Sequence, residues 1–88
     1  MVAKRITLGD KNSCAICYDE DYVKVWNISL GKLKTTLEYG RRKVVNLVSL
    51  KDGRILIVKF KKDNRVVLVD VDSNYEKTLY EGDEDVKL

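Results

Sequence analysis

The sequence predicts an all-β fold built from two four-stranded antiparallel sheets. β-Branched and other apolar residues recur with a period of two along eight short segments. Turn-forming Gly, Asn and Asp residues separate these segments, and the order of segments and turns repeats after 42–43 residues. No segment has the period of an amphipathic helix. These observations together indicate a chain of β-hairpins arranged as two similar units.

The first unit is expected within residues 4–39. Its strands are predicted at 4–8, 14–18, 23–28 and 33–39. Turns rich in Gly, Asp and Asn separate the first three of these strands, and a turn that contains Gly31 precedes the fourth. The fourth strand is the most polar, which is typical of a strand at the outer edge of a sheet.

The second unit is expected within residues 44–80. Its strands are predicted at 44–50, 54–60, 65–71 and 75–80. Asp52 and Gly53 form the Asp-Gly pair that marks a tight hairpin. The two middle strands are apolar on both faces, as expected for strands covered on both sides. Residues 81–88 are expected to form an acidic tail or the start of a further strand.

The two units are related by a repeat of fixed length. Leu8 and Leu50 are 42 residues apart, as are Gly40 and Gly82. A repeat of this length with four strands per unit is typical of a β-propeller blade. Residues 1–88 are therefore interpreted as a single unit that contains two blade-like repeats. A small β-barrel or sandwich with the same strand spacing is the alternative.

Individual residues within this pattern also resemble those of a known family. Trp26 and Asn27 end the third strand of the first unit, and Val69 and Asp70 lie at the corresponding place in the second. At these positions the chain resembles the WD-repeat β-propeller family, with Asn27 in place of the usual Asp and Val69 in place of the usual Trp. The resemblance implies a propeller fold, a structural role for Trp26 between packed strands, and a function in protein–protein interaction.

The chain departs from that family in two respects. Typical repeats of the family hold a buried network that includes His, but the chain has no His, and Arg41 and Asp83 occupy the two His positions. Two blades also cannot close a ring, because propellers use four to eight. We therefore expect a homo-oligomer or part of a larger propeller. The acidic residues 19–21 and 83–85 would meet at the seam between identical copies, which disfavours a ring of copies.

The composition argues against several classes of function. The 88 residues allow one small domain, and the 17 basic and 14 acidic side chains give a net charge of +3. The absence of His and of a glycine-rich phosphate loop argues against an enzyme, and neither a cofactor nor a metal is expected. The sequence lacks an apolar run that could span a membrane and a signal peptide, so a cytoplasmic protein with reduced thiols is expected.

Two local motifs are interpreted as structural. Cys14 and Cys17 form a Cys-x-x-Cys pattern, but in a strand they point to opposite faces, so neither a disulfide nor joint metal binding is expected. The acidic residues 19–21 lack the spaced ligands of a calcium loop and are interpreted as a turn. Three tyrosines near turns are candidate contact residues: Tyr18, Tyr22 and Tyr39.

Charge is distributed unevenly, and this gives the candidate site. Residues 32–65 carry eleven Lys or Arg and three acids, whereas residues 70–85 carry seven acids and one Lys. Six basic residues fall in two loops that the family resemblance places at the same end of the fold: Arg41, Arg42, Lys43, Lys61, Lys62 and Arg65.

These loops are the predicted partner-binding surface. We expect a non-enzymatic WD-like module for protein–protein interaction or scaffold assembly, which completes a propeller with itself or with another chain. The alternative is a small basic β-protein that binds nucleic acid through residues 41–43 and 61–65. The acidic C-terminal third argues against that alternative.

Overall fold

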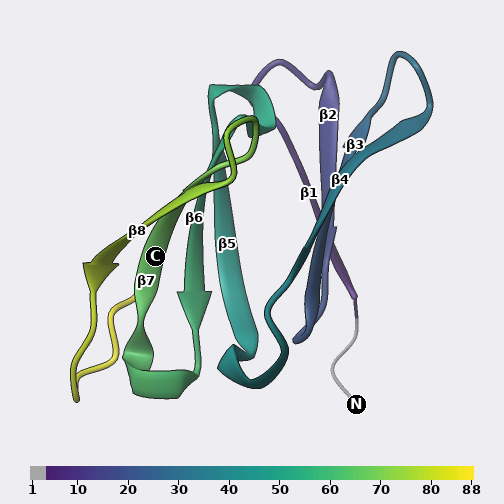
Figure 1. The fold of residues 1–88 in the computed structure, drawn as a ribbon. Helices are drawn as coiled ribbons and strands as arrows, with labels where there is room; N and C mark the ends of the chain where they lie inside the picture. Colours follow the sequence, from purple (N-terminus) through teal and green to yellow (C-terminus); the bar gives the residue numbers. More distant parts are fainter. Residues whose placement is uncertain (1–3) are drawn as a thin grey trace.

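The computed structural model describes residues 4–88, which fold into two four-stranded antiparallel sheets (Figure 1). The first sheet contains β1 (Arg5–Leu8), β2 (Cys14–Tyr18), β3 (Tyr22–Asn27) and β4 (Lys32–Glu38). The second contains β5 (Val44–Leu50), β6 (Ile55–Phe60), β7 (Val66–Asp70) and β8 (Tyr75–Tyr80). The predicted all-β class and the two sheets are confirmed. The described residues do not close into a barrel.

Each sheet is a meander in which strands follow one another in chain order. In the first sheet Cys14 pairs with Asn27, and in the second Ile55 pairs with Asp70. β3 pairs with β4 through a register shift at Val25. Meanders of this kind need only tight turns, which explains why turn residues could mark nearly every strand boundary.

The turns that join the third and fourth strands are alike in the two sheets. The Asn27 side chain accepts a hydrogen bond from the Leu30 backbone N–H at 3.0 Å, and the Asp70 carboxylate accepts bonds from the N–H groups of Asp72 at 3.1 Å and Ser73 at 3.3 Å. Both residues therefore close an Asx-type turn. Asn27 and Asp70 thus have the same local role at the ends of β3 and β7.

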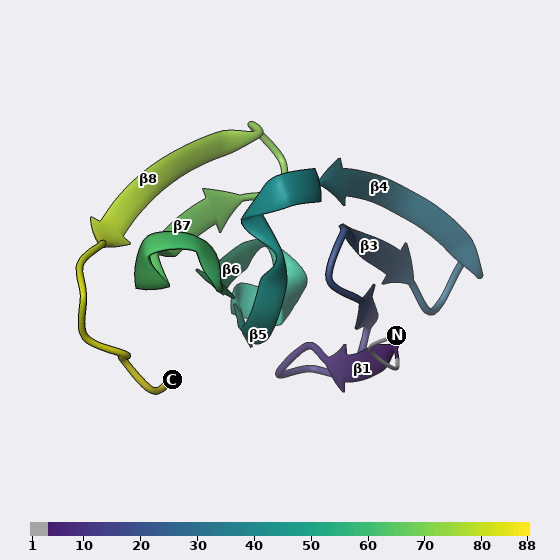
Figure 2. The ribbon, with the colours of Figure 1, turned by 90° about the horizontal axis from the view of Figure 1, so that it is seen from below.

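The sheets stack face to face around one apolar core. In Figure 2 both sheets run from an inner strand, β1 or β5, to an outer strand, β4 or β8. The core is formed by alternate residues of β2 and β3 and by residues of the strands that face them. Its fully buried side chains include Ile16, Val23, Val25, Leu56, Val58, Phe60 and Val67.

The hairpin turn of the second sheet packs tightly on the first sheet. Gly53 has a φ of +84°, and a Cβ placed on it would lie 2.3 Å from the Sγ of Cys14. The neighbouring Asp52 carboxylate accepts hydrogen bonds from the Ser13 hydroxyl and, at 3.3 Å, from the Lys11 backbone N–H. The Asp-Gly pair therefore makes the hairpin and also positions one sheet on the other.

Residues 81–88, the tail, contain no strand in this structure. The tail turns back along the second sheet. The Gly82 N–H donates to the Asp63 carbonyl at 3.0 Å, and the Tyr80 hydroxyl donates to the Glu84 carbonyl at 3.2 Å. Asp85 pairs with Lys59, which is almost fully buried on the outer face of β6.

Candidate functional site

The two predicted basic loops lie side by side. Arg41 and Arg42 belong to the 3₁₀ turn η1 (Gly40–Arg42), which connects the two sheets, and Lys62 belongs to η3 (Lys62–Asn64), which connects β6 and β7. The Lys61 backbone N–H donates a hydrogen bond to the Lys43 carbonyl at 2.8 Å. This backbone contact joins the two loops at one end of the fold.

Three of the six basic side chains are paired with acids. Arg42 pairs with Glu76 at 2.8 Å, Lys43 with Asp21 at 2.7 Å and Arg65 with Glu81 at 2.7 Å. The hydrogen bond from Lys43 to Asp21 raises the pKa of the lysine. Within residues 4–88, no acid lies within ion-pair distance of the exposed Arg41, Lys61 or Lys62 side chains. Much of the charge of the predicted surface is thus neutralised inside the fold.

Arg42 is held more firmly than a surface cation. Its guanidinium lies 4.7 Å from the centre of the Tyr39 ring and 4.6 Å from the centre of the Phe60 ring. The two rings meet edge to face at 4.8 Å. A guanidinium that both stacks on aromatic rings and pairs with a carboxylate is fixed in one orientation. Arg42 therefore stabilises the junction between the sheets, a role that the sequence did not reveal.

The outer face of the first sheet is apolar and exposed. Ile6, Leu8, Trp26 and Leu33 all lie open on this side, which faces away from the second sheet. The Trp26 side chain is 38% exposed. No layer of the described residues covers this face of the sheet, so the expected packing of Trp26 between strands would require a further sheet.

The outer face of the second sheet is also partly uncovered. Val48 and Leu50 of β5 are exposed, and Ile57 and Leu68 beside them are half-buried. The tail covers only one end of this face, near Lys59. The two sheets together thus present one apolar face at each side of the stack, a feature typical of interaction surfaces.

The cysteines and the acidic turn have structural roles. Cys14 is buried in the core, and burial raises the pKa of its thiol, whereas Cys17 lies on the other face of β2 and both are free. Asp19 accepts hydrogen bonds from the N–H groups of Asp21 at 2.8 Å and Tyr22 at 2.9 Å, and the first of these lowers its pKa most. Within residues 4–88, no three Cys, Asp or Glu side chains are grouped to hold a metal ion.

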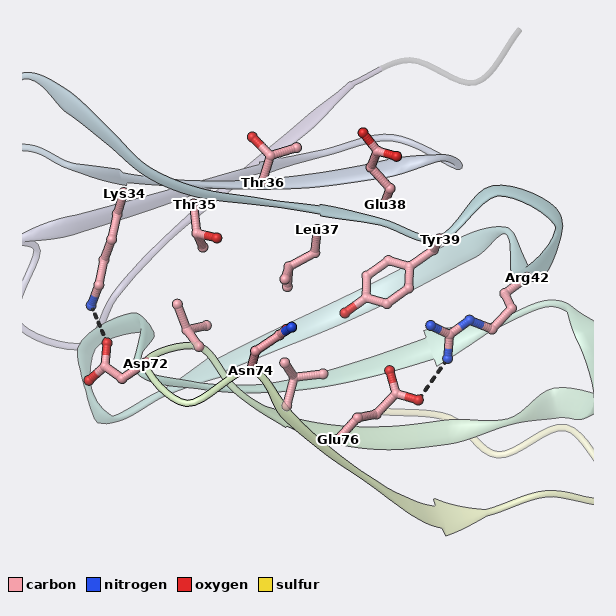
Figure 3. A pocket seen from close by; sticks show the side chains of 12 residues that line it. Lys34, Thr35, Thr36, Leu37, Glu38, Tyr39, Arg42, Asp72, Asn74 and Glu76 are labelled. Atoms are coloured by element: carbon pink, nitrogen blue, oxygen red, sulfur yellow. Dashed lines mark hydrogen bonds and ion pairs between the residues drawn. The ribbon is translucent and has the colours of Figure 1, made fainter.

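A cleft of about 870 Å³ separates β4 from β7, β8 and the turn between them (Figure 3). It is lined by Lys34–Tyr39, Arg42, Val69, Val71, Asp72, Asn74 and Glu76. Of the three tyrosines predicted as contact residues, Tyr18 and Tyr39 are buried and Tyr22 is exposed. Tyr39 lines the cleft, which no sequence signal indicated, because the cleft is formed by strands of different sheets.

Comparisons with protein-family models, with curated proteins and with solved structures give no match for this chain. Among the described residues, no helix has the length and apolar character needed to cross a membrane.

Proposed function

We propose that the chain is a non-enzymatic, WD-like protein-interaction module that assembles head to tail with further copies of itself. In this assembly the outer face of the first sheet of one copy packs on the outer face of the second sheet of the next. The proposal is supported by the equivalence of the two sheets, by the exposed apolar residues on both faces and by the path of the tail.

The equivalence follows from the strand register. Asn27 and Asp70 both close the turn after the third strand, and they pair with Cys14 and Ile55 respectively. When these pairs are superposed in register, Trp26 corresponds to Val69. Val69 is only 2% exposed, since it is buried against the first sheet. Trp26 thus lies at a position that is covered in the second sheet, and this observation carries the proposal.

The opposite faces correspond in the same way. Ile16 and Val25, which pair with each other on the buried face of the first sheet, correspond to Ile57 and Leu68 on the outer face of the second. The contact between the two sheets of one chain is therefore a template for the contact between two chains. A first sheet from a second copy has the apolar residues needed to cover Ile57 and Leu68.

The tail follows the path of the connection between the sheets. The Gly40 N–H donates to the Asp21 carbonyl at 3.4 Å, and 42 residues later the Gly82 N–H donates to the Asp63 carbonyl at 3.0 Å. The first part of the tail thus leaves the second sheet as the connection leaves the first. This path leads toward the place that a following sheet would occupy.

The assembly is tested by measuring the mass of the native protein by light scattering on a sizing column. We expect a sharp mass of two to four copies of the 10.1 kDa chain. Leu8→Lys places a charge on the outer face of the first sheet, and Val48→Lys places one on that of the second. Each variant alone should be a monomer, because a buried unpaired charge opposes the contact. Leu30→Lys, in an exposed turn away from both faces, is the matched control and should keep the wild-type mass.

Mixing the two face variants identifies the geometry. Each variant retains one intact face, so an equimolar mixture should give a dimer that contains one copy of each. A dimer of either variant by itself would point instead to a symmetric contact between like faces. A folded wild-type monomer at about 10 kDa would contradict the proposal.

A further inference from the structure

One wall of the cleft between the sheets is formed by the free edge of a strand. β4 is the last strand of the first sheet, so one of its edges has no strand partner within residues 4–88. Six consecutive residues of this segment, Lys34–Tyr39, line the cleft. Since alternate residues of a strand point to opposite faces, a lining of consecutive residues places the backbone edge itself at the cleft.

Two ion pairs bridge the cleft at its ends. Lys34 reaches across to Asp72 at 2.8 Å, and Arg42 reaches across to Glu76 at 2.8 Å (Figure 3). Between them Leu37, Val69 and Val71 supply apolar surface. The strand from Lys34 to Tyr39 has a length of about 17 Å at the usual rise per residue, which matches about five residues of an extended peptide.

Tyr39 gives the cleft a hydrogen-bond donor that has no partner within the described residues. Its side chain is only 8% exposed, and its hydroxyl makes no hydrogen bond within the described part of the chain. Figure 3 shows the hydroxyl pointing into the cleft between the two sheets. Burial raises the pKa of Tyr39 to about 12, so the hydroxyl is protonated at neutral pH. The hydroxyl lies at the surface of the cleft, where the carbonyl of a bound peptide can accept its hydrogen bond in place of water.

The same residues exclude other classes of ligand. Both cations that line the cleft are already paired with carboxylates, and the additional Glu38 makes the lining slightly acidic, which disfavours phosphate and other anions. The Tyr39 ring is contacted by Phe60 and by the Arg42 guanidinium, so it is not free to stack on a base or a sugar. The uncharged backbone of an extended peptide with small side chains fits this lining better than an anion, a base or a sugar.

We propose that this cleft binds an extended, uncharged peptide segment of a partner protein, which adds as a strand to the free edge of β4. One peptide carbonyl accepts the hydrogen bond of the Tyr39 hydroxyl, and one apolar side chain of the peptide packs on Leu37 and Val71. Strand addition of this kind takes its affinity from backbone hydrogen bonds and its specificity from pockets for alternate side chains.

This site is separate from the faces used for assembly. Tyr39 and the strand edge lie between the two sheets of one chain, whereas Leu8 and Val48 lie on the outer faces of the stack. Peptide binding is therefore measured on the native protein in whatever oligomeric state it adopts. Its result does not depend on the light-scattering result.

The test begins with selection from a displayed library of random dodecapeptides on the immobilised full chain. The enriched peptide is then synthesised and its dissociation constant is measured with wild type and with variants. Tyr39→Phe removes only the hydroxyl and should weaken binding about fivefold to tenfold, as expected for one hydrogen bond. Thr35→Trp fills the cleft and should abolish binding. Tyr22→Phe, which removes an exposed hydroxyl elsewhere, should bind like wild type.

Circular dichroism verifies that each variant is folded, and amide chemical shifts locate the peptide. We expect shifts along Lys34–Tyr39 and, on the opposite wall, at Val69, Val71 and Glu76. If Thr35→Trp does not fold, the shifts and the Tyr39→Phe affinity still decide the question. The proposal is overturned if no peptide is enriched, if the enriched peptide binds Tyr39→Phe and wild type equally, or if its shifts fall outside the cleft.

Discussion

Replacing Gly53 with alanine should remove a large part of the stability of the fold. The added Cβ would lie 2.3 Å from the Sγ and 3.1 Å from the Cβ of Cys14, so one sheet must move away from the other. Forcing extra atoms into a packed core costs roughly 1–3 kcal/mol. The φ of +84° adds roughly 1–2 kcal/mol for a residue with a side chain. The free energy of unfolding should therefore fall by roughly 2–5 kcal/mol.

Urea unfolding followed by far-ultraviolet circular dichroism measures this loss at a fixed protein concentration. A domain of 88 residues has an unfolding free energy of about 4–13 kcal/mol, so the variant should be markedly less stable than wild type. With a slope of about 1 kcal/mol per molar urea, the midpoint should fall by about 2 M or more. Gly31→Ala is the matched control, since Gly31 has a φ of +64° and open space around it. It should cost about 1 kcal/mol.

A double-mutant cycle separates the overlap from the backbone strain. Cys14→Ala removes the sulfur that the new Cβ would meet. The loss of unfolding free energy in the double variant should therefore be smaller, by about 1–2 kcal/mol, than the sum of the losses in the two single variants. Additive effects, within about 0.5 kcal/mol, would show that Gly53 does not pack on Cys14. The described stacking of the two sheets would then be incorrect.

Two further predictions concern residues at the junction between the sheets. Because burial, with a smaller contribution from Glu76, raises the Tyr39 pKa from 10 to about 12, its contribution to stability is complete below pH 10 and is lost as the pH rises through 12. Across this range the free energy of unfolding of wild type should fall by up to about 2–3 kcal/mol relative to that of Tyr39→Phe. Urea midpoints that fall in parallel for both proteins would refute this prediction. Arg42→Ala should lower the free energy of unfolding by about 1–2 kcal/mol, whereas Arg41→Ala should lower it by less than about 0.5 kcal/mol. Thermal unfolding compares the two variants, and equal midpoints would contradict the stacking of Arg42.

Local signals were sufficient for the strands and the turns. Asp52 and Gly53 marked the hairpin that the structure contains, and the strand predicted at 44–50 has the observed bounds. The strand predicted at 65–71 is one residue shorter at each end. These features depend on residues close together in the chain, because each strand pairs with its sequence neighbour.

Contacts between the sheets were not visible in the sequence. Arg42 is indistinguishable from Arg41 in a basic loop, and only the fold places it beside Phe60 and Glu76, which are 18 and 34 residues away. Trp26 is exposed because residues 4–88 contain no layer over the outer face of the first sheet, whereas the family resemblance implies a neighbouring blade there. The cleft was not predicted either, since its two walls come from different sheets.

The presence of two sheets in each chain limits the assemblies that the chain can form alone. In the proposed assembly every added copy contributes the two sheets of residues 4–88, so a closed ring of identical copies would contain an even number of blades. Two, three or four copies correspond to four, six or eight blades, which spans the usual range of propellers. A ring with five or seven blades would require a different protein to supply an odd number of sheets. The parity of the blade count thus distinguishes an assembly of this chain alone from one completed by a partner.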